Sequence, residues 1–156
     1  MIRRLNHAVL YVRDAVAAAE FYTTVLGFEE ITRMGDNAVF LGLPRSPNDH
    51  DLGLFSVGPG ATPGRGPGLY HLAWEVDTLQ DLVDIRQRLS AAGALGGASD
   101  HGGTKSLYGK DVDGLEFEIM WEVPVALWTG PRELKVAPLD LDAEIARYGA
   151  TTSRNI

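Results

Sequence analysis

The sequence contains no cysteine among its 156 residues. This absence excludes disulfide frameworks, thiolate zinc sites and iron–sulfur clusters, so only His, Asp, Glu and neutral oxygens could bind a metal ion. No apolar stretch approaches membrane-spanning length, and none follows the first residues as the core of a signal peptide would. We therefore expect a soluble cytoplasmic protein.

Positive charge is also scarce. The chain has 14 Lys and Arg against 21 Asp and Glu, its formal net charge is −7, and its dense basic pair is Arg3 and Arg4. Since phosphate contacts need clustered Lys and Arg, this composition argues against a nucleic-acid-binding surface. The expected partner is a small molecule, with no nucleic acid and no membrane, and a homo-oligomer is compatible with this expectation.

The length and the hydrophobic content of 45% allow one sizeable core, which favours a single globular domain made of two half-domains. Residues 58–68 are too rich in glycine and proline for a helix or a strand, so we interpret them as a linker. The predicted organisation is a first unit at 1–57, the linker at 58–68, a second unit at 69–122, and a C-terminal tail with a short helix at 123–156.

Both units show the pattern of a strand, a helix and three further strands. Asp14 predicts the beginning of the first helix and Gly27 its end. In the second unit, Thr78 with Asp81 resembles a capping box, and Gly93 predicts the helix end. The further strands are expected at 28–32, 38–43 and 52–57, and then near 95, at 106–109 and at 115–121. The expected fold class is α+β, with two βαβββ units forming a curved mixed sheet around a metal cleft.

The opening strand of each unit carries a histidine at the same place, His7 in the first copy and His71 in the second. If the copies pack by pseudo-twofold symmetry, both imidazoles can lie on opposite walls of one cleft. A lone strand histidine is more often a hydrogen-bonded core or surface residue. Two at equivalent positions, together with a matching carboxylate, favour a metal site.

Strand alternation predicts which side chains share this cleft, because successive side chains point to opposite faces. The apolar residues of the opening and last strands form the helix-facing sides, which turns His7, His71 and Glu118 the other way. Glu116 has the same parity as Glu118, and parity alone does not choose between them. Two imidazoles and one carboxylate are the ligand set used for Fe(II) or Mn(II) with open coordination positions.

These residues resemble the vicinal oxygen chelate superfamily, which includes glyoxalases, bleomycin-resistance proteins, fosfomycin-modifying transferases and extradiol dioxygenases. The resemblance covers residues 5–121, and its late acidic turn followed by a ligand glutamate implies Glu118. Residues 100–111 are similar to the extradiol signature, in which a histidine precedes a hydrophobic-Tyr pair, although Val112 replaces the proline usual in the turn. The tail at 138–142 is similar to that of small catechol 2,3-dioxygenase-like proteins.

The resemblance implies an extradiol ring-cleaving dioxygenase that inserts O₂ into a catecholic aromatic substrate. Its 2-His-1-Glu site, made by His7, His71 and Glu118, would hold Fe(II), with Mn(II) as the alternative.

Three further residues receive catalytic roles from the same resemblance. His101 would be the acid/base group, because histidine changes charge near cellular pH. Tyr108 would hydrogen-bond substrate oxygen, and His50 would stabilise bound oxygen. The simpler interpretations are a packed strand aromatic for Tyr108 and an ordinary solvated loop around His50.

Other activities of the superfamily remain as alternatives. A glyoxalase-type isomerase uses a fourth ligand, typically a Glu on the strand corresponding to 52–57, and this strand has no carboxylate. A fosfomycin-type transferase shares the three-ligand set. A metal-free drug-binding protein of the bleomycin-resistance kind would leave the complete triad unexplained. The tail is equally well interpreted as a strap packed over the sheet through Trp128 and Leu141.

Overall fold

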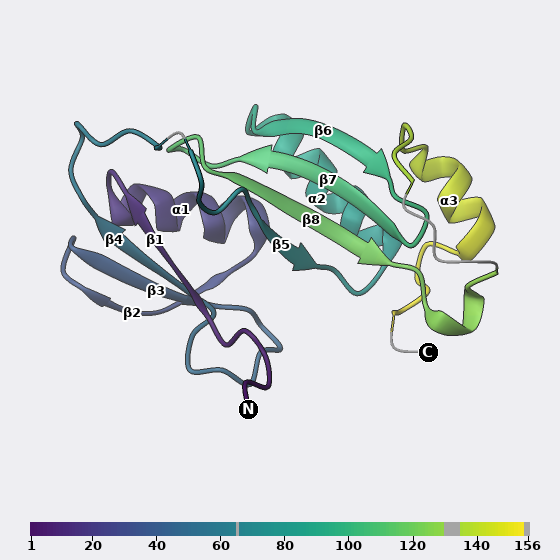
Figure 1. Cartoon of the computed structure of the whole chain (residues 1–156), viewed down its shortest axis with the longest axis horizontal. Coiled ribbons are helices and arrows are strands. Elements are labelled where there is room, and N and C mark those ends of the chain that lie inside the picture. The colour runs from purple at the N-terminus through teal and green to yellow at the C-terminus, as the bar shows by residue number, and fades with distance from the viewer. Residues whose placement is uncertain (65, 130–134, 155–156) are drawn as a thin grey trace. The chain divides into compact units, whose positions relative to one another are not determined.

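The structure is a computed structural model that describes residues 1–64, 66–129 and 135–154. The chain divides into two compact units, each of which contains a four-stranded mixed sheet and a helix (Figure 1). Unit 1 comprises Met1–Gly66 with Asp111–Leu115, and unit 2 comprises Pro67–Lys110 with Glu116–Ile156. The predicted α+β class with two βαβββ units is confirmed. The predicted unit boundaries at 57, 68 and 122 stay a prediction.

Unit 1 has the predicted order of elements. They are β1 (Ala8–Val12), α1 (Ala15–Leu26), β2 (Glu29–Met34), β3 (Ala38–Gly42) and β4 (Leu52–Ser56). In the sheet the strand order is β1-β4-β3-β2, with β1 parallel to β4 and the other pairs antiparallel. The crossover through α1 therefore places the first strand beside the last.

Local sequence signals fix the ends of α1. The Asp14 side chain accepts hydrogen bonds from two backbone N–H groups of the first turn, and Gly27 ends the helix in the left-handed conformation at φ 81°. Its buried side includes Phe21, Tyr22 and Val25, which pack toward the sheet.

Unit 2 repeats this topology. Its elements are β5 (Leu72–Glu75), α2 (Leu79–Ala91), β6 (Leu95–Asp100), β7 (Thr104–Lys110) and β8 (Glu116–Glu122), followed by a 3₁₀ turn η1 (Val125–Leu127) and α3 (Leu141–Tyr148). The strand order β5-β8-β7-β6 matches that of unit 1, with β5 parallel to β8. The capping box of Thr78 and Asp81 is present, and Gly93 follows the last helical turn with φ 65°. Both helix signals are confirmed.

The predicted alternation along the strands is also confirmed. In β8, Phe117, Ile119 and Trp121 are buried, whereas Glu118 and Met120 between them are half-buried. In β1, Val9 and Tyr11 are 51% and 75% exposed. The turn Asp111–Leu115 lies between β7 and β8 but packs with unit 1, where the Arg13 side chain pairs with Asp113. Within the described ranges, no helix is both long enough and apolar enough to cross a membrane.

Candidate metal and acid/base site

Four of the predicted site residues form one chain of contacts in unit 2. His71 directly precedes β5, His101 directly follows β6, and Tyr108 and Glu118 lie opposite one another on the paired strands β7 and β8. The His71 Nε2 atom lies 3.1 Å from Glu118 Oε2, Glu118 Oε1 lies 3.4 Å from the Tyr108 hydroxyl, and that hydroxyl lies 2.9 Å from His101 Nε2. The fold therefore brings these four side chains together from separate parts of the sequence.

The pair of His71 and Glu118 fits two ligands of one metal ion. Metal bonds of roughly 2.1 Å to nitrogen and oxygen, set at about a right angle, separate the two ligand atoms by about 3 Å. This separation agrees with the observed 3.1 Å. Both side chains are largely buried, and a neutral imidazole with a carboxylate suits a divalent ion of hard or borderline character.

The structure also separates the two glutamates that strand parity left equivalent. Glu118 lies beside Nε2 of His71, whereas Glu116 Oε1 lies 3.9 Å from Nδ1. That Nδ1 atom is buried and has no hydrogen-bond partner among the described residues. Glu116 also bonds the hydroxyl of Tyr70, and this hydrogen bond raises the pKa of that tyrosine. Glu118 thus lies beside Nε2 of His71 and Glu116 nearest its Nδ1, while the role of Glu118 as a metal ligand stays a prediction.

The hydrogen bonds of His101 fix its neutral tautomer. Its Nδ1 atom lies 2.8 Å from the backbone carbonyl oxygen of Lys135, and a carbonyl oxygen only accepts. Nδ1 must therefore carry the hydrogen, which leaves the lone pair of the neutral ring on Nε2. Tyr108 donates its hydroxyl hydrogen to that lone pair.

Tyr108 has one hydrogen to share between two acceptors. Burial and the nearby charge of Glu118 raise the pKa of Tyr108 above its usual value, so the phenol stays protonated at neutral pH. Its hydroxyl lies closer to His101 Nε2, at 2.9 Å, than to Glu118 Oε1, at 3.4 Å.

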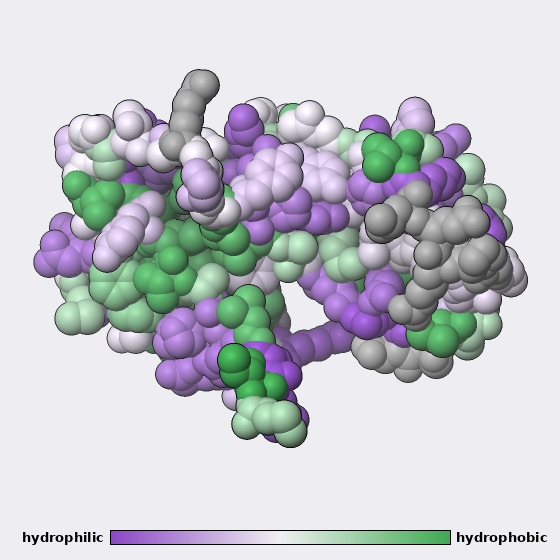
Figure 2. Space-filling model, viewed as in Figure 1, coloured by the Kyte–Doolittle hydropathy of each residue, from purple (hydrophilic) through white to green (hydrophobic). Residues whose placement is uncertain are grey.

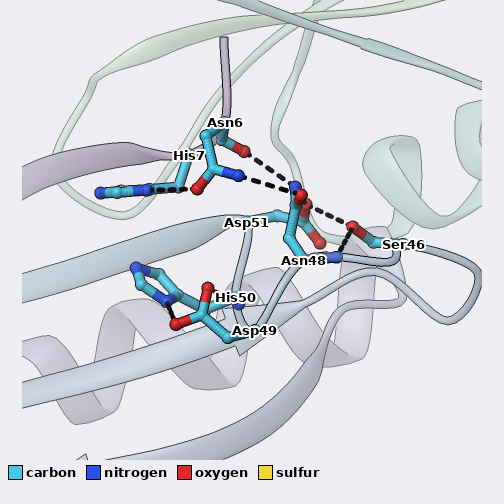
Figure 3. A network of polar contacts seen from close by, with 7 residues as sticks. All are labelled: Asn6, His7, Ser46, Asn48, Asp49, His50 and Asp51. Carbon is cyan, nitrogen blue, oxygen red and sulfur yellow. Dashed lines mark hydrogen bonds and ion pairs between the residues drawn. The ribbon is translucent and has the colours of Figure 1, made fainter. Parts of the chain in front are cut away.

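Unit 1 holds the remaining two predicted residues, His7 and His50. Their ring centroids are 4.5 Å apart, and His50 Nδ1 pairs with Asp49 at 3.2 Å (Figure 3). His7 Nδ1 lies 2.9 Å from Asn6 Oδ1, while the amide nitrogen of Asn6 donates to Asn48. This arrangement orients the amide oxygen of Asn6 toward His7 Nδ1.

Asp51, which follows His50 in the chain, already has several hydrogen-bond donors. Asp51 accepts hydrogen bonds from the backbone of Leu43 and from the side chains of Ser46 and Asn48, as Figure 3 shows for the two side chains. Burial raises the pKa of Asp51, but these hydrogen bonds outweigh burial and lower it overall. Asp51 therefore holds the loop before β4, and β4 itself has no carboxylate to offer as a further ligand.

The structure therefore brings two of the three predicted ligands together within unit 2, and the third, His7, lies in unit 1. Among the residues described, no group of three His, Asp or Glu side chains is arranged to hold a metal ion. The role of His7 as the third ligand stays a prediction.

Sequence reasoning missed three residues that contact the predicted ones. Asn6 and Tyr70 each directly precede a predicted ligand histidine in the sequence, a position that could have drawn attention to them. Lys135 contacts His101 through its backbone carbonyl, and a backbone contact leaves no signature in the residue type.

Comparisons with known proteins agree with this fold. The sequence model of the Glyoxalase/Bleomycin resistance protein/Dioxygenase superfamily matches residues 4–119. A solved glyoxylase/bleomycin resistance protein/dioxygenase domain from a Frankia species has a TM-score of 0.66 and 26% sequence identity to this chain. The match covers 79% of this chain and 94% of that domain.

Three curated relatives carry different activities. An ethylmalonyl-CoA/methylmalonyl-CoA epimerase from Cereibacter sphaeroides is 34% identical over 60% of this chain and 74% of its own length. A catechol-2,3-dioxygenase from Bacillus subtilis is 28% identical over 83% of this chain, and a manganese-dependent 2,3-dihydroxybiphenyl 1,2-dioxygenase from Geobacillus genomosp. 3 is 25% identical over 78%. This chain spans 45% and 38% of the lengths of these two dioxygenases.

Proposed function

The chain belongs to the Glyoxalase/Bleomycin resistance protein/Dioxygenase superfamily, and from that premise we propose that it is a metal-dependent extradiol dioxygenase. Its reaction would insert O₂ into a catecholic ring beside the two hydroxyls. The observation that carries the proposal is the contact chain His71–Glu118–Tyr108–His101, because it combines two metal-ligand types with an acid/base pair on one sheet face.

The residues proposed to hold the ion are His7, His71 and Glu118. An Fe(II) or Mn(II) ion bound there would supply open positions at which a catecholate and dioxygen can meet. The manganese-dependent relative supports Mn(II) as the alternative to Fe(II). The side-chain oxygen of Asn6 would orient His7 by accepting the hydrogen on His7 Nδ1. Glu116 is the nearest acceptor for a hydrogen on His71 Nδ1.

The acid/base work falls to His101. Ring cleavage requires that a catechol hydroxyl lose a proton and that a proton later return to product oxygen. With Nδ1–H bound to the Lys135 carbonyl, Nε2 is the atom that takes and returns this proton. When Nε2 takes the proton from the catechol hydroxyl, the imidazole becomes positively charged beside the catecholate, and it returns to neutral when the proton goes back to product oxygen.

Tyr108 would orient the substrate oxygen. Its raised pKa keeps it a hydrogen-bond donor at neutral pH, and its hydroxyl lies between His101 and Glu118. His50, beside His7 in unit 1, is proposed to stabilise bound oxygen.

A second candidate is a metal-dependent epimerase, which the 34% identical relative favours. Epimerisation beside a carbonyl also needs a metal and an acid/base pair, so His101 and Tyr108 would serve there as well. The glyoxalase-type isomerase is less well supported, because the strand expected to supply a fourth ligand has none and Asp51 is fully engaged.

Oxygen uptake distinguishes these candidates. The full-length protein is loaded anaerobically with Fe(II) or Mn(II) and mixed with a panel of catechols that carry hydrogen, alkyl, carboxylate or phenyl substituents. The proposal predicts consumption of O₂ together with a coloured ring-opened product. Exchange of solvent deuterium into methylmalonyl-CoA without O₂ uptake would contradict the dioxygenase proposal and support the epimerase. Tight drug binding by the metal-free protein, with neither reaction, would contradict both enzyme candidates and support a drug-binding protein of the bleomycin-resistance kind.

A further inference from the structure

We propose that residues 135–137 of the C-terminal tail position His101 for proton transfer, through the backbone carbonyl of Lys135 and a short strand-like pairing with Asp100. The inference rests on the proposed function and deepens it. It assigns the tail a role in the chemistry, beyond that of covering the sheet.

The contact that carries the inference selects one tautomer. The Lys135 carbonyl lies 2.8 Å from His101 Nδ1, and it can only accept. In the opposite neutral tautomer, Nδ1 would present a lone pair to this oxygen, and Nε2–H would point at Tyr108. The carbonyl therefore disfavours the form of His101 that could not take a proton at Nε2.

A backbone pairing of Ala137, two residues after Lys135, holds the Lys135 carbonyl in place. Asp100 and Ala137 form an antiparallel bridge, in which the Asp100 N–H donates to the Ala137 oxygen at 2.8 Å and the Ala137 N–H donates back at 3.1 Å. Since Asp100 is the neighbour of His101 in the chain, this pairing sets the distance between the ring and the tail.

Side chains reinforce the same junction. Both carboxylate oxygens of Asp100 are paired with lysines, Oδ1 with Lys105 and Oδ2 with Lys135. The Gly102 N–H also donates to Oδ1 at 2.8 Å. Burial raises the pKa of Asp100, but these bonds outweigh burial and hold it below its usual range, so Asp100 stays charged at neutral pH. Lysines from β7 and from the tail thus share one buried carboxylate.

The tail is anchored on both sides of this junction. After it, the buried Lys105 ammonium pairs with Glu144 of α3 at 3.1 Å, and Tyr148 of α3 lies against Trp121. Before it, the Trp128 ring covers Gly103 so closely that a Cβ at this position would overlap the ring. Lys105 is on the same strand as Tyr108, so one anchor of the tail and the partner of His101 belong to the same strand.

The test compares two substitutions at Ala137 in the full-length protein. Ala137→Pro removes the N–H that donates to Asp100, while Ala137→Ser keeps it and is the matched control. Histidine-¹⁵N NMR of the metal-free protein reports the tautomer of His101, whose signals are identified by their loss in His101→Phe. Turnover, KM for the catechol and Mn(II) affinity are measured in parallel.

The expected wild-type result is a neutral His101 with hydrogen on Nδ1. In Ala137→Pro we expect a mixture of tautomers and a kcat lowered by roughly tenfold, because the acid/base group is partly misoriented. KM and Mn(II) affinity should remain unchanged, and Ala137→Ser should resemble the wild type.

Two results would overturn the inference. One is hydrogen on Nε2 in the wild type, which decides the question even if Ala137→Pro fails to fold. The other is an Ala137→Pro protein that folds and keeps the wild-type tautomer. If the wild type cleaves no catechol, the proposed function is wrong. The NMR result then still tests whether the tail sets the tautomer of His101.

Discussion

The two units share one topology but present different surfaces on the sheet face opposite the helix. In unit 2, the side chains of His71, Glu118, Tyr108 and His101 form a continuous polar chain. In unit 1, the residues that follow His7 on the same side of β1 are the exposed Val9 and Tyr11. Figure 2 shows hydrophobic residues gathered at the surface over the region of β1 and β4.

Unit 1 also has a pocket of about 230 Å³ at the end of β1. Its lining is mostly apolar and includes Tyr11, Val57, Pro63 and Leu115. The duplicated fold has therefore diverged in chemistry. Unit 2 carries the residues proposed for proton transfer and two of the predicted ligands, whereas unit 1 offers one predicted ligand beside an apolar surface.

The largest effect is expected from Glu118→Ala. Removing the carboxylate of a predicted ligand should abolish Mn(II) binding in calorimetry and with it turnover. Glu116→Ala, two residues away on the same side of β8, is the matched control and should keep measurable metal binding, with affinity lowered by roughly tenfold. An equal loss of Mn(II) affinity in both variants would contradict the assignment of Glu118 as the ligand and Glu116 as its neighbour.

His101→Phe should separate metal binding from chemistry. Turnover should fall by about 10²-fold or more, because general acid/base catalysis contributes factors of that size, while Mn(II) affinity stays at the wild-type level. The measurement is oxygen uptake beside calorimetry on the same preparation. Full ring cleavage by this variant would show that unit 2 does its proton transfer elsewhere.

Lys105→Met should reveal how firmly the tail is held in unit 2. Lys105 is 1% exposed, and its loss leaves Asp100 and Glu144 without a buried counter-charge, so we expect unfolding in urea to become easier by about 3 kcal/mol. Lys135→Met removes the exposed partner of the same Asp100 and should change stability by less than about 1 kcal/mol. Similar losses in the two variants would contradict this ranking.

The difference in unfolding free energy between the wild type and Lys105→Met should depend on pH in a defined direction. Because the folded-state pKa of Asp100 is lowered, its ion pairs stabilise the fold fully above its unfolded value of about 4 and lose this contribution as pH falls through the folded value. The stability gap between wild type and Lys105→Met should therefore narrow in acid. A gap that widens below pH ~4 would contradict the assignment.

The smallest effect is expected in unit 1. Tyr11→Ala removes an exposed aromatic ring from the side of β1 that carries His7, and it should raise KM for a phenyl-substituted catechol by roughly fivefold with kcat unchanged. Tyr11→Phe keeps the ring and is the control. A fall in kcat with unchanged KM would place chemistry, rather than binding, in unit 1.

Features set by neighbouring residues were predictable from the sequence. The beginnings of α1 and α2 depend on Asp14 and Thr78, and the face of each strand depends on alternation, so both could be read locally. The preference for Glu118 over Glu116 as the ligand came from the family resemblance, because both have the same parity. The structure adds that each glutamate lies beside a different nitrogen of His71.

Contacts made between distant segments could not be predicted. The Lys135 carbonyl reaches His101 across 34 residues, and a carbonyl belongs to every residue type. The turn Asp111–Leu115 packs with unit 1, where Asp111 accepts a hydrogen bond from the buried Tyr22 hydroxyl. Neither partner is implied by spacing or by composition.

The decisive measurement is a crystal structure of the Mn(II)-loaded protein with anomalous scattering at the manganese edge. We predict one strong peak bound by Nε2 of His71, a carboxylate oxygen of Glu118 and Nε2 of His7, with His101 and Tyr108 near it but not bound to it. A peak held by His71 and Glu118 without His7, or manganese bound at other residues, would contradict a shared metal site between the two histidine-bearing units.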